Sequence, residues 1–190
     1  KHGIDEKKKI LTLIPGSRQQ EIDQMWNIYY NAAMKIQESF DIEIVVAKSS
    51  GIVLPKTNDF RIETKDIYGA MTHATAAITT SGTASLECAV LDTPQVVCYK
   101  MSKISGLIAK HMNRAPFISM PNLIAEKQVV SEFVQKEVNA TNITKAILPL
   151  LSDSVERKKM LQDFEQIRRS LGLPGVYDRA AESIINKGKN

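Results

Sequence analysis

The sequence has few of the residues that mark secreted, membrane-spanning or metal-binding proteins. Its 190 residues include two cysteines, Cys88 and Cys98, which lie in apolar surroundings without the spacing of metal ligands. We expect both to be reduced core residues of a cytoplasmic protein. No apolar run approaches the length of a membrane span, and residues 1–9 do not lead into the apolar segment of a signal peptide.

Two common signatures of phosphate binding are also missing. The chain has neither the GK[ST] ending of a Walker loop nor the GxGxxG fingerprint of dinucleotide-binding proteins. Its net charge of +4 is a mild basic bias. Such a bias suits a phosphate-bearing ligand or an anionic surface, but it is too small to indicate a nucleic-acid-binding protein. We therefore expect no nucleic-acid partner and no metal site.

Strand and helix patterns alternate over the first hundred residues. Apolar, β-rich runs predict strands at residues 9–14, 42–47, 60–63, 76–79 and 95–99. Helical patterns fill the segments between them, at residues 20–36, 66–73 and 83–91. Strands that are apolar throughout are typical of a parallel sheet buried on both faces. The pattern thus predicts an α/β fold with a doubly wound parallel sheet.

The remainder of the chain has the character of a helical region. Helices are predicted at residues 102–113, 131–138, 142–151, 153–171 and 177–186, and no strand is predicted beyond a short segment at 117–118. We expect residues 1–9 to be a linker from a missing N-terminal half and residues 10–151 to form the sheet domain. Residues 152–190 would then pack as helices on that domain or on the missing half.

One candidate ligand-binding loop follows the first predicted strand, because ligands of such sheets bind beyond the carboxyl ends of the strands. Gly16 permits close approach of the backbone, Ser17 can cap the next helix, and Arg18 offers a planar fork to phosphate. A capping box of Ser17 with Gln20 is the simpler interpretation. It leaves Arg18 at a helix N-terminus, where the helix dipole disfavours a cation. We therefore favour a bound anion here.

A second candidate loop lies within AAITTSGTASLE, residues 76–87, where hydroxyl side chains crowd around one glycine. Backbone N–H groups and hydroxyls of Ser81, Gly82 and Thr83 at a helix N-terminus can bind an anion. Glu87, one turn into that helix, can accept hydrogen bonds from sugar hydroxyls. For this loop by itself a capped helix with a solvated Glu87 is the better interpretation. The presence of two such loops at one sheet edge favours the ligand site.

Three segments then carry a family resemblance. LIPGSRQQEI, TTSGTASLECAVLDTPQVVCYK and MPNLIAEKQVVSEFVQ, in this order, resemble the C-terminal half of lipid-A-disaccharide synthases. These are GT-B glycosyltransferases of lipopolysaccharide biosynthesis, and the resemblance runs from about Ile10 to the end of the chain. The SGT-x-x-LE element is weak evidence for this family by itself. Together with the GSR, PN and E-x-x-Q elements it makes the resemblance specific.

The resemblance implies a hexosyltransferase whose Rossmann-like domain, residues 10–151, binds UDP-2,3-diacylglucosamine. The full enzyme joins this donor to 2,3-diacylglucosamine 1-phosphate, inverts the anomeric centre and releases UDP, without a metal or cofactor. Ser81, Gly82 and Thr83 would contact the diphosphate, Glu87 the ribose, and Arg18 the negative charge that develops on the departing UDP.

Further site residues are implied only by position. Backbone groups near Thr64 and Lys65 are candidates for binding uracil, and Asn122, Glu132 and Gln135 match family positions near the cleft. The expected substrate contacts are Gly16, Ser17, Arg18, Thr64, Lys65, Ser81, Gly82, Thr83, Glu87, Asn122, Glu132 and Gln135.

The sequence departs from the family pattern in two ways, of which we expect the first to have little consequence. Ser131 stands where the family often has proline, and we expect it to cap the same helix. The general base is expected in the missing half, because the three histidines, His2, His73 and His111, are poor substitutes. We therefore expect this chain to be inactive without the other half.

Residues 102–114 combine an apolar face with lysine and arginine, a pattern found on membrane surfaces and, more often, packed on the protein's own domain. Lipid substrates are compatible with peripheral contact at the inner membrane, and a homodimer is compatible with the family. Two alternatives stay open: another UDP-GlcNAc-type GT-B enzyme, such as an epimerase, or a nucleotide-sugar-binding module without catalysis. An epimerase would be expected to carry its own histidines and carboxylates in this half.

Overall fold

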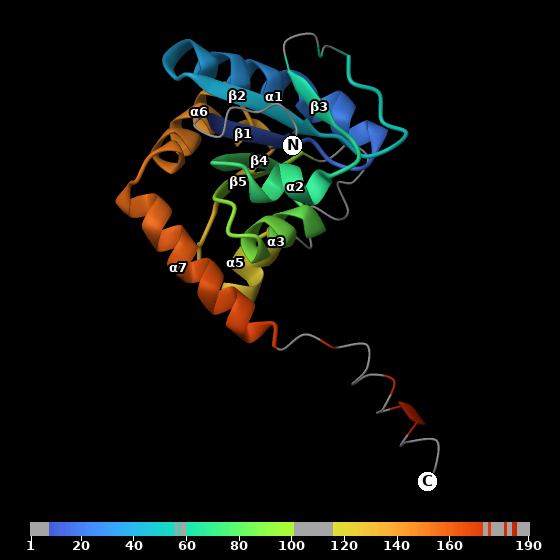
Figure 1. The fold of residues 1–190 in the computed structure, drawn as a ribbon, viewed down its shortest axis with the longest axis vertical. Helices are drawn as coiled ribbons and strands as arrows, with labels where there is room; N and C mark the ends of the chain where they lie inside the picture. The colour runs from blue at the N-terminus through green and yellow to red at the C-terminus, as the bar shows by residue number, and fades with distance from the viewer. Residues whose placement is uncertain are drawn as a thin grey trace.

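The computed structural model describes residues 8–55, 57, 60–100 and 116–172, together with residues 175, 181, 184 and 185. These residues form a six-stranded parallel sheet in the order β3-β2-β1-β4-β5-β6 (Figure 1). The strands are β1 (Lys9–Ile14), β2 (Ile42–Ala47), β3 (Arg61–Glu63), β4 (Ala76–Thr80), β5 (Gln95–Tyr99) and β6 (Ser131–Val134). The order reverses between β1 and β4, which confirms the predicted doubly wound, Rossmann-like fold.

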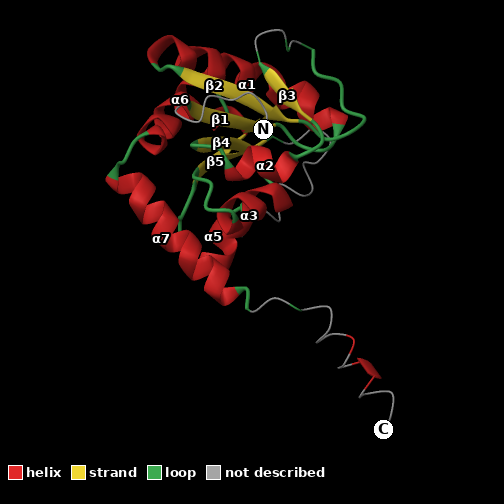
Figure 2. Cartoon of the chain, in the orientation of Figure 1, coloured by secondary structure: helices red, strands yellow, loops and turns green. Residues whose placement is uncertain are grey.

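Helices cover the sheet, as Figure 2 shows. Those of the first half are α1 (Gln19–Ser39), α2 (Ile67–Thr72) and α3 (Thr83–Val90). Among its described residues, the second half adds α5 (Met120–Ala125), α6 (Ala140–Ile147) and α7 (Val155–Ser170), with the short 3-10 helices η2 (Gln135–Glu137) and η3 (Leu148–Leu151). Helix α1 packs beside α6, whereas α7 contacts both α3 and α5.

The side chains of β1 alternate between two buried layers. Leu11 and Leu13 join the core that contains the buried face of α1, whereas Ile14 packs with residues of α2 and α3. The Thr12 hydroxyl, on the same side as Ile14, donates to the Ala70 carbonyl oxygen of α2 at 2.8 Å. Burial on both faces explains why this strand is apolar nearly throughout.

The helix predicted at residues 131–138 is wrong. Ser131 begins strand β6, which pairs in parallel with β5, and only residues 135–137 are helical, as a 3-10 turn. Ser131 therefore caps no helix. The four residues SEFV are all half-buried, so their pattern of apolar residues carries no clear period. Pairing with β5 decides their conformation.

Two smaller differences lie nearby. The segment 117–118 is not a strand; it leads into α5, which the sequence did not predict and whose first turn contains Pro121. The helix predicted at 142–151 is divided into α6 and η3, where Pro149 cannot continue the α-helical hydrogen bonds.

Some predictions fall outside the described residues. These include the helix at 102–113, the basic segment 102–114 and most of the last helix at 177–186. Within the described part of the chain, no helix is long and apolar enough to cross a membrane. Cys88 and Cys98 are both buried free thiols, as predicted.

Candidate functional site

The strand order places the two candidate loops next to each other. Ile14 at the end of β1 pairs with Thr79 near the end of β4, so residues 15–18 and 81–83 leave neighbouring strands at one edge of the sheet. Of the helices that follow, α1 packs in the core layer of Leu11 and Leu13, whereas α3 contributes Ala89 to that layer and Cys88 to the layer of Ile14. Reversal of strand order at this point is the feature at which doubly wound sheets bind their ligands.

The first loop is closed by a carboxylate from its own helix. One oxygen of Glu21, Oε2, accepts hydrogen bonds from the backbone N–H groups of Ser17 and Arg18 at 3.2 and 3.3 Å. Gly16 has φ of 113°, and a Cβ atom there would lie 2.4 Å from the same oxygen. This position thus requires glycine for its backbone conformation and for the approach of Glu21.

The alternative interpretation of a capping box formed by Ser17 with Gln20 is therefore wrong. The N-cap residue of α1 is Arg18, and Glu21, three residues later, supplies the carboxylate that reaches back. Arginine has no side-chain acceptor, so Arg18 cannot provide the other half of a box. Glu21 was not singled out from the sequence, although its place three residues after Arg18 was a usable signal.

Glu21 also changes the argument for Arg18. The Arg18 guanidinium lies 3.4 Å from Glu21 Oε1, and the Arg18 side chain is 81% exposed. A carboxylate within the chain thus already balances a cation at the start of α1. The position of Arg18 does not by itself require a bound anion, but its exposed guanidinium at the edge between β1 and β4 is available to one.

Most hydroxyls of the second loop have partners inside the protein. Thr79 donates to Gln95 Oε1 at 2.8 Å, and the Thr80 hydroxyl lies 3.0 Å from the Tyr29 hydroxyl of α1. The Ser81 hydroxyl donates to the Ile118 carbonyl oxygen at 3.1 Å. Ser85 likewise donates to the carbonyl oxygen of Gly82. The hydroxyl-rich composition therefore mainly fixes the end of β4 and the start of α3.

The N-terminus of α3 is more open than that of α1. Its N-cap residue, Gly82, has no side chain that could cap the helix, and both Gly82 and Thr83 are exposed. Glu87 is half-buried one turn further on, and its carboxylate has no recorded hydrogen bond or ion pair in the described part of the chain. Unbonded N–H groups and the helix dipole make this end of α3 suitable for an anion.

Asn122 and Glu132 come together, but as partners of each other. Asn122 Nδ2 donates to Glu132 Oε1 at 2.7 Å, and Asn122 Oδ1 accepts from the N–H groups of Val129 and Val130. Glu132 also accepts from the N–H groups of Ile118 and Ser119 and from the Ser119 hydroxyl. Asn122 is completely buried. These contacts hold α5 and the preceding loop against β6.

The remaining candidates lie further from the two loops. Thr64 and Lys65 follow β3, which is separated from β1 by β2, and the Lys65 N–H donates to Glu63 Oε1 at 2.7 Å. That N–H group is therefore not available to a uracil ring in this conformation. Gln135 follows β6, is half-buried, and has a left-handed backbone with φ of 52°.

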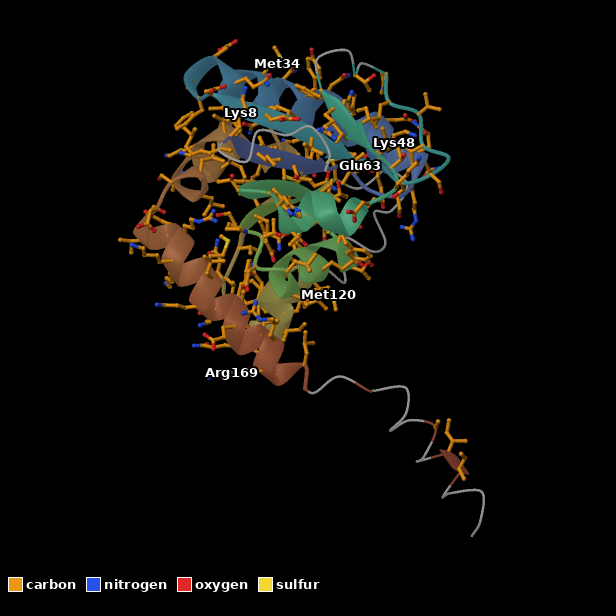
Figure 3. The ribbon with its side chains drawn as sticks, viewed as in Figure 1. Lys8, Met34, Lys48, Glu63, Met120 and Arg169 are labelled. Atoms are coloured by element: carbon orange, nitrogen blue, oxygen red, sulfur yellow. The ribbon has the colours of Figure 1, made fainter. Side chains whose placement is uncertain are left out.

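Lys48, which was not among the predicted site residues, directly follows β2 and lies at the same edge of the sheet. Its backbone N–H donates to the Glu63 carbonyl oxygen at 2.9 Å, and the two residues lie side by side in Figure 3. The usable signal was the position of a lysine right after a buried apolar strand.

One hollow of the surface does not belong to this edge. A depression of about 590 Å³, lined by residues that include Lys8, Phe40 and Asp41, lies at the amino end of β2, opposite the loops. Among the residues that the structure describes, no three His, Cys, Asp or Glu side chains are grouped as metal ligands.

A family model described as lipid-A-disaccharide synthetase matches residues 1–182. The chain belongs to this family. It is 32% identical over 197 residues to a lipid-A-disaccharide synthase of Synechocystis sp. (strain ATCC 27184 / PCC 6803 / Kazusa), with 97% of the chain and 50% of that protein aligned. The chain thus spans about half the length of the curated relatives it matches.

Solved structures show the same fold at lower identity. The calicheamicin glycosyltransferase CalG4 matches 96% of the chain and 44% of its own length, with a TM-score of 0.61 and 17% identity. A structure described as a UDP-N-acetylglucosamine 2-epimerase from Listeria monocytogenes matches 86% of the chain and 43% of its own length, with a TM-score of 0.57 and 16% identity. The fold is therefore found in both of these proteins and does not distinguish between them. The match to the family model, and not the fold, assigns this chain to its family.

Proposed function

We propose that this chain is the donor-binding half of an inverting glycosyltransferase. The enzyme would join UDP-2,3-diacylglucosamine to 2,3-diacylglucosamine 1-phosphate and release UDP. The observation that supports this most is the pairing of β1 with β4, which puts the Arg18 loop beside the uncapped N-terminus of α3. Together they offer a guanidinium and backbone N–H groups to one diphosphate.

The same groups suit catalysis as well as binding. When the bond between the anomeric carbon and the phosphate oxygen breaks, negative charge grows on the departing UDP. Arg18 and the N–H groups of Gly82 and Thr83 are positioned to stabilise that charge, and this stabilisation is stronger in the transition state than in the bound donor. Glu87, on the same helix, would accept hydrogen bonds from the ribose.

The domain organisation and surroundings form part of the proposal. Residues 10–151 would be the UDP-sugar-binding domain, residues 1–9 a linker, and residues 152–190 helices that pack on it or on another half. The acceptor site and the general base would lie in the part of the enzyme that this chain does not span. We further propose a cytoplasmic location with peripheral contact at the inner membrane.

The test is a titration of the 190-residue chain with UDP, UMP and inorganic phosphate by calorimetry. We expect saturable but weak UDP binding, because half of the enclosing surface is missing and solvent screens the contacts. UMP should bind less tightly than UDP, because it lacks the second phosphate. Absence of UDP binding to the folded chain would contradict the donor-site proposal.

A second measurement tests the half-enzyme proposal. The purified chain, incubated with both lipid substrates, should release no UDP and form no disaccharide, because none of its residues is proposed to deprotonate the acceptor hydroxyl. Disaccharide formation by the purified chain would show that the general base lies within these 190 residues.

A further inference from the structure

The Glu132 carboxylate is the centre of a hydrogen-bond network that reaches the end of β4. Its Oε2 accepts from the Ile118 N–H at 2.9 Å. Its Oε1 accepts from the Ser119 N–H at 2.9 Å, the Ser119 hydroxyl at 2.6 Å and Asn122 Nδ2 at 2.7 Å. Four donors on one carboxylate fix residues 118–122 firmly against β6.

Asn122 anchors the other side of this network. Its amide donates to the Val130 carbonyl oxygen at 2.9 Å and accepts from the N–H groups of Val129 and Val130 at 2.7 and 2.9 Å. A completely buried amide with all of these partners has little freedom to turn. Glu132 and Asn122 thus hold the backbone of Ile118 and Ser119 at a defined distance from the sheet.

The backbone of Ile118 in turn holds Ser81. The Ser81 hydroxyl donates to the Ile118 carbonyl oxygen at 3.1 Å, and the Ser81 N–H donates to the Cys98 carbonyl oxygen at 2.9 Å. Because its proton is used in this way, the Ser81 hydroxyl does not donate to a phosphate in this arrangement. Its contribution is to fix the residue directly before Gly82 and Thr83.

We propose that Glu132 is a positioning residue for the donor diphosphate: through Ile118 and Ser81 it sets the orientation of the Gly82 and Thr83 N–H groups. This rests on the proposed function, because it takes these N–H groups to be the diphosphate contacts. Glu132 itself touches neither the ligand nor the reacting atoms. A binding site formed by backbone N–H groups is sensitive to small displacements. The hydrogen bonds that fix Ser81, directly before Gly82, therefore affect the affinity for the diphosphate.

The experiment uses Glu132→Gln, Ser81→Ala, the double variant, and Glu137→Gln as a matched control on the neighbouring 3-10 helix. Glutamine at 132 keeps one acceptor oxygen but presents an N–H₂ group to a donor, so the network loses hydrogen bonds. Ser81→Ala removes only the hydrogen bond from Ser81 to the Ile118 carbonyl oxygen. It tests the proposal even if Glu132→Gln fails to fold.

The first measurement needs no ligand. The amide resonances of residues 81–83 in the free chain should shift in Glu132→Gln and in Ser81→Ala, and should stay in place in Glu137→Gln. Unchanged resonances in Glu132→Gln would overturn the proposed positioning, whatever the chain binds.

The second measurement is UDP affinity by calorimetry. Each single variant should bind UDP about three- to tenfold less tightly, the effect of one hydrogen bond. The double variant should lose no more UDP affinity than the weaker-binding single variant, because both substitutions break the same chain of hydrogen bonds. Wild-type affinity in folded Glu132→Gln, or additive losses in the double variant, would also overturn the positioning role. If the resonances shift but the wild type does not bind UDP, the proposed function is rejected, whereas the structural link from Glu132 to residues 81–83 still holds.

Discussion

Arg18→Ala distinguishes a binding role of Arg18 from a structural one. We expect the substitution to change the stability of the fold little and the affinity for UDP strongly. In the structure the Arg18 side chain is 81% exposed, and its guanidinium lies 3.4 Å from Glu21 Oε1. Exposed ion pairs of this kind contribute about 0–1 kcal/mol to stability. The substitution keeps the backbone N–H of Arg18 and its bond to Glu21. We therefore expect the melting temperature to fall by no more than about 4 °C.

The expected effect on UDP binding is much larger. Loss of a charge-assisted contact with the diphosphate costs about 1.5–3 kcal/mol, which is a loss of about 10- to 150-fold in affinity. The UDP affinity of Arg18→Lys should lie between those of the wild type and Arg18→Ala, because lysine keeps the charge but lacks the planar guanidinium. Calorimetric titration with UDP, beside thermal unfolding of each variant, measures both quantities.

Arg169→Ala is the matched control. Arg169 is also exposed and also pairs with a carboxylate of its own helix, Glu165, but it lies on α7, away from the loops (Figure 3). Its replacement should leave UDP affinity unchanged. If Arg18→Ala binds UDP as tightly as the wild type, Arg18 does not contact the diphosphate and the assignment fails.

Three further predictions follow from the same contacts. Gly16→Ala should destabilise the fold by about 1–3 kcal/mol, measured by denaturant unfolding, because alanine strains a backbone with φ of 113° and meets Glu21; an unchanged midpoint would contradict this. Glu87→Gln should weaken UDP binding but leave inorganic phosphate binding unchanged, and equal losses for both ligands would remove Glu87 from the ribose. Burial raises the pKa of Cys98 to about 12 and that of Cys88 further, so both stay as thiols at pH 8 and should resist alkylation until the chain unfolds. Rapid labelling of the folded chain at that pH would disprove their burial.

The sequence was sufficient for five of the six strands of the sheet and for the position of its two candidate loops. Buried parallel strands need apolar residues on both faces, so β1, β2, β4 and β5 are visible as apolar runs with turn residues after them. Loops that follow such strands open onto the ligand-binding edge in this class of fold. The chain segments that contain Arg18 and Gly82 could therefore be placed without coordinates.

Tertiary structure decided which polar groups are used internally, because hydrogen-bond partners depend on approach in space. The hydroxyl of Ser81 looked like a ligand contact but donates to Ile118, thirty-seven residues away in the chain. Glu132 looked like a helix residue near the cleft, yet pairing with β5 makes it part of a strand, where its carboxylate faces residues 118–122. Local sequence sets the pattern of burial, whereas contacts between distant segments set the partner of each polar group.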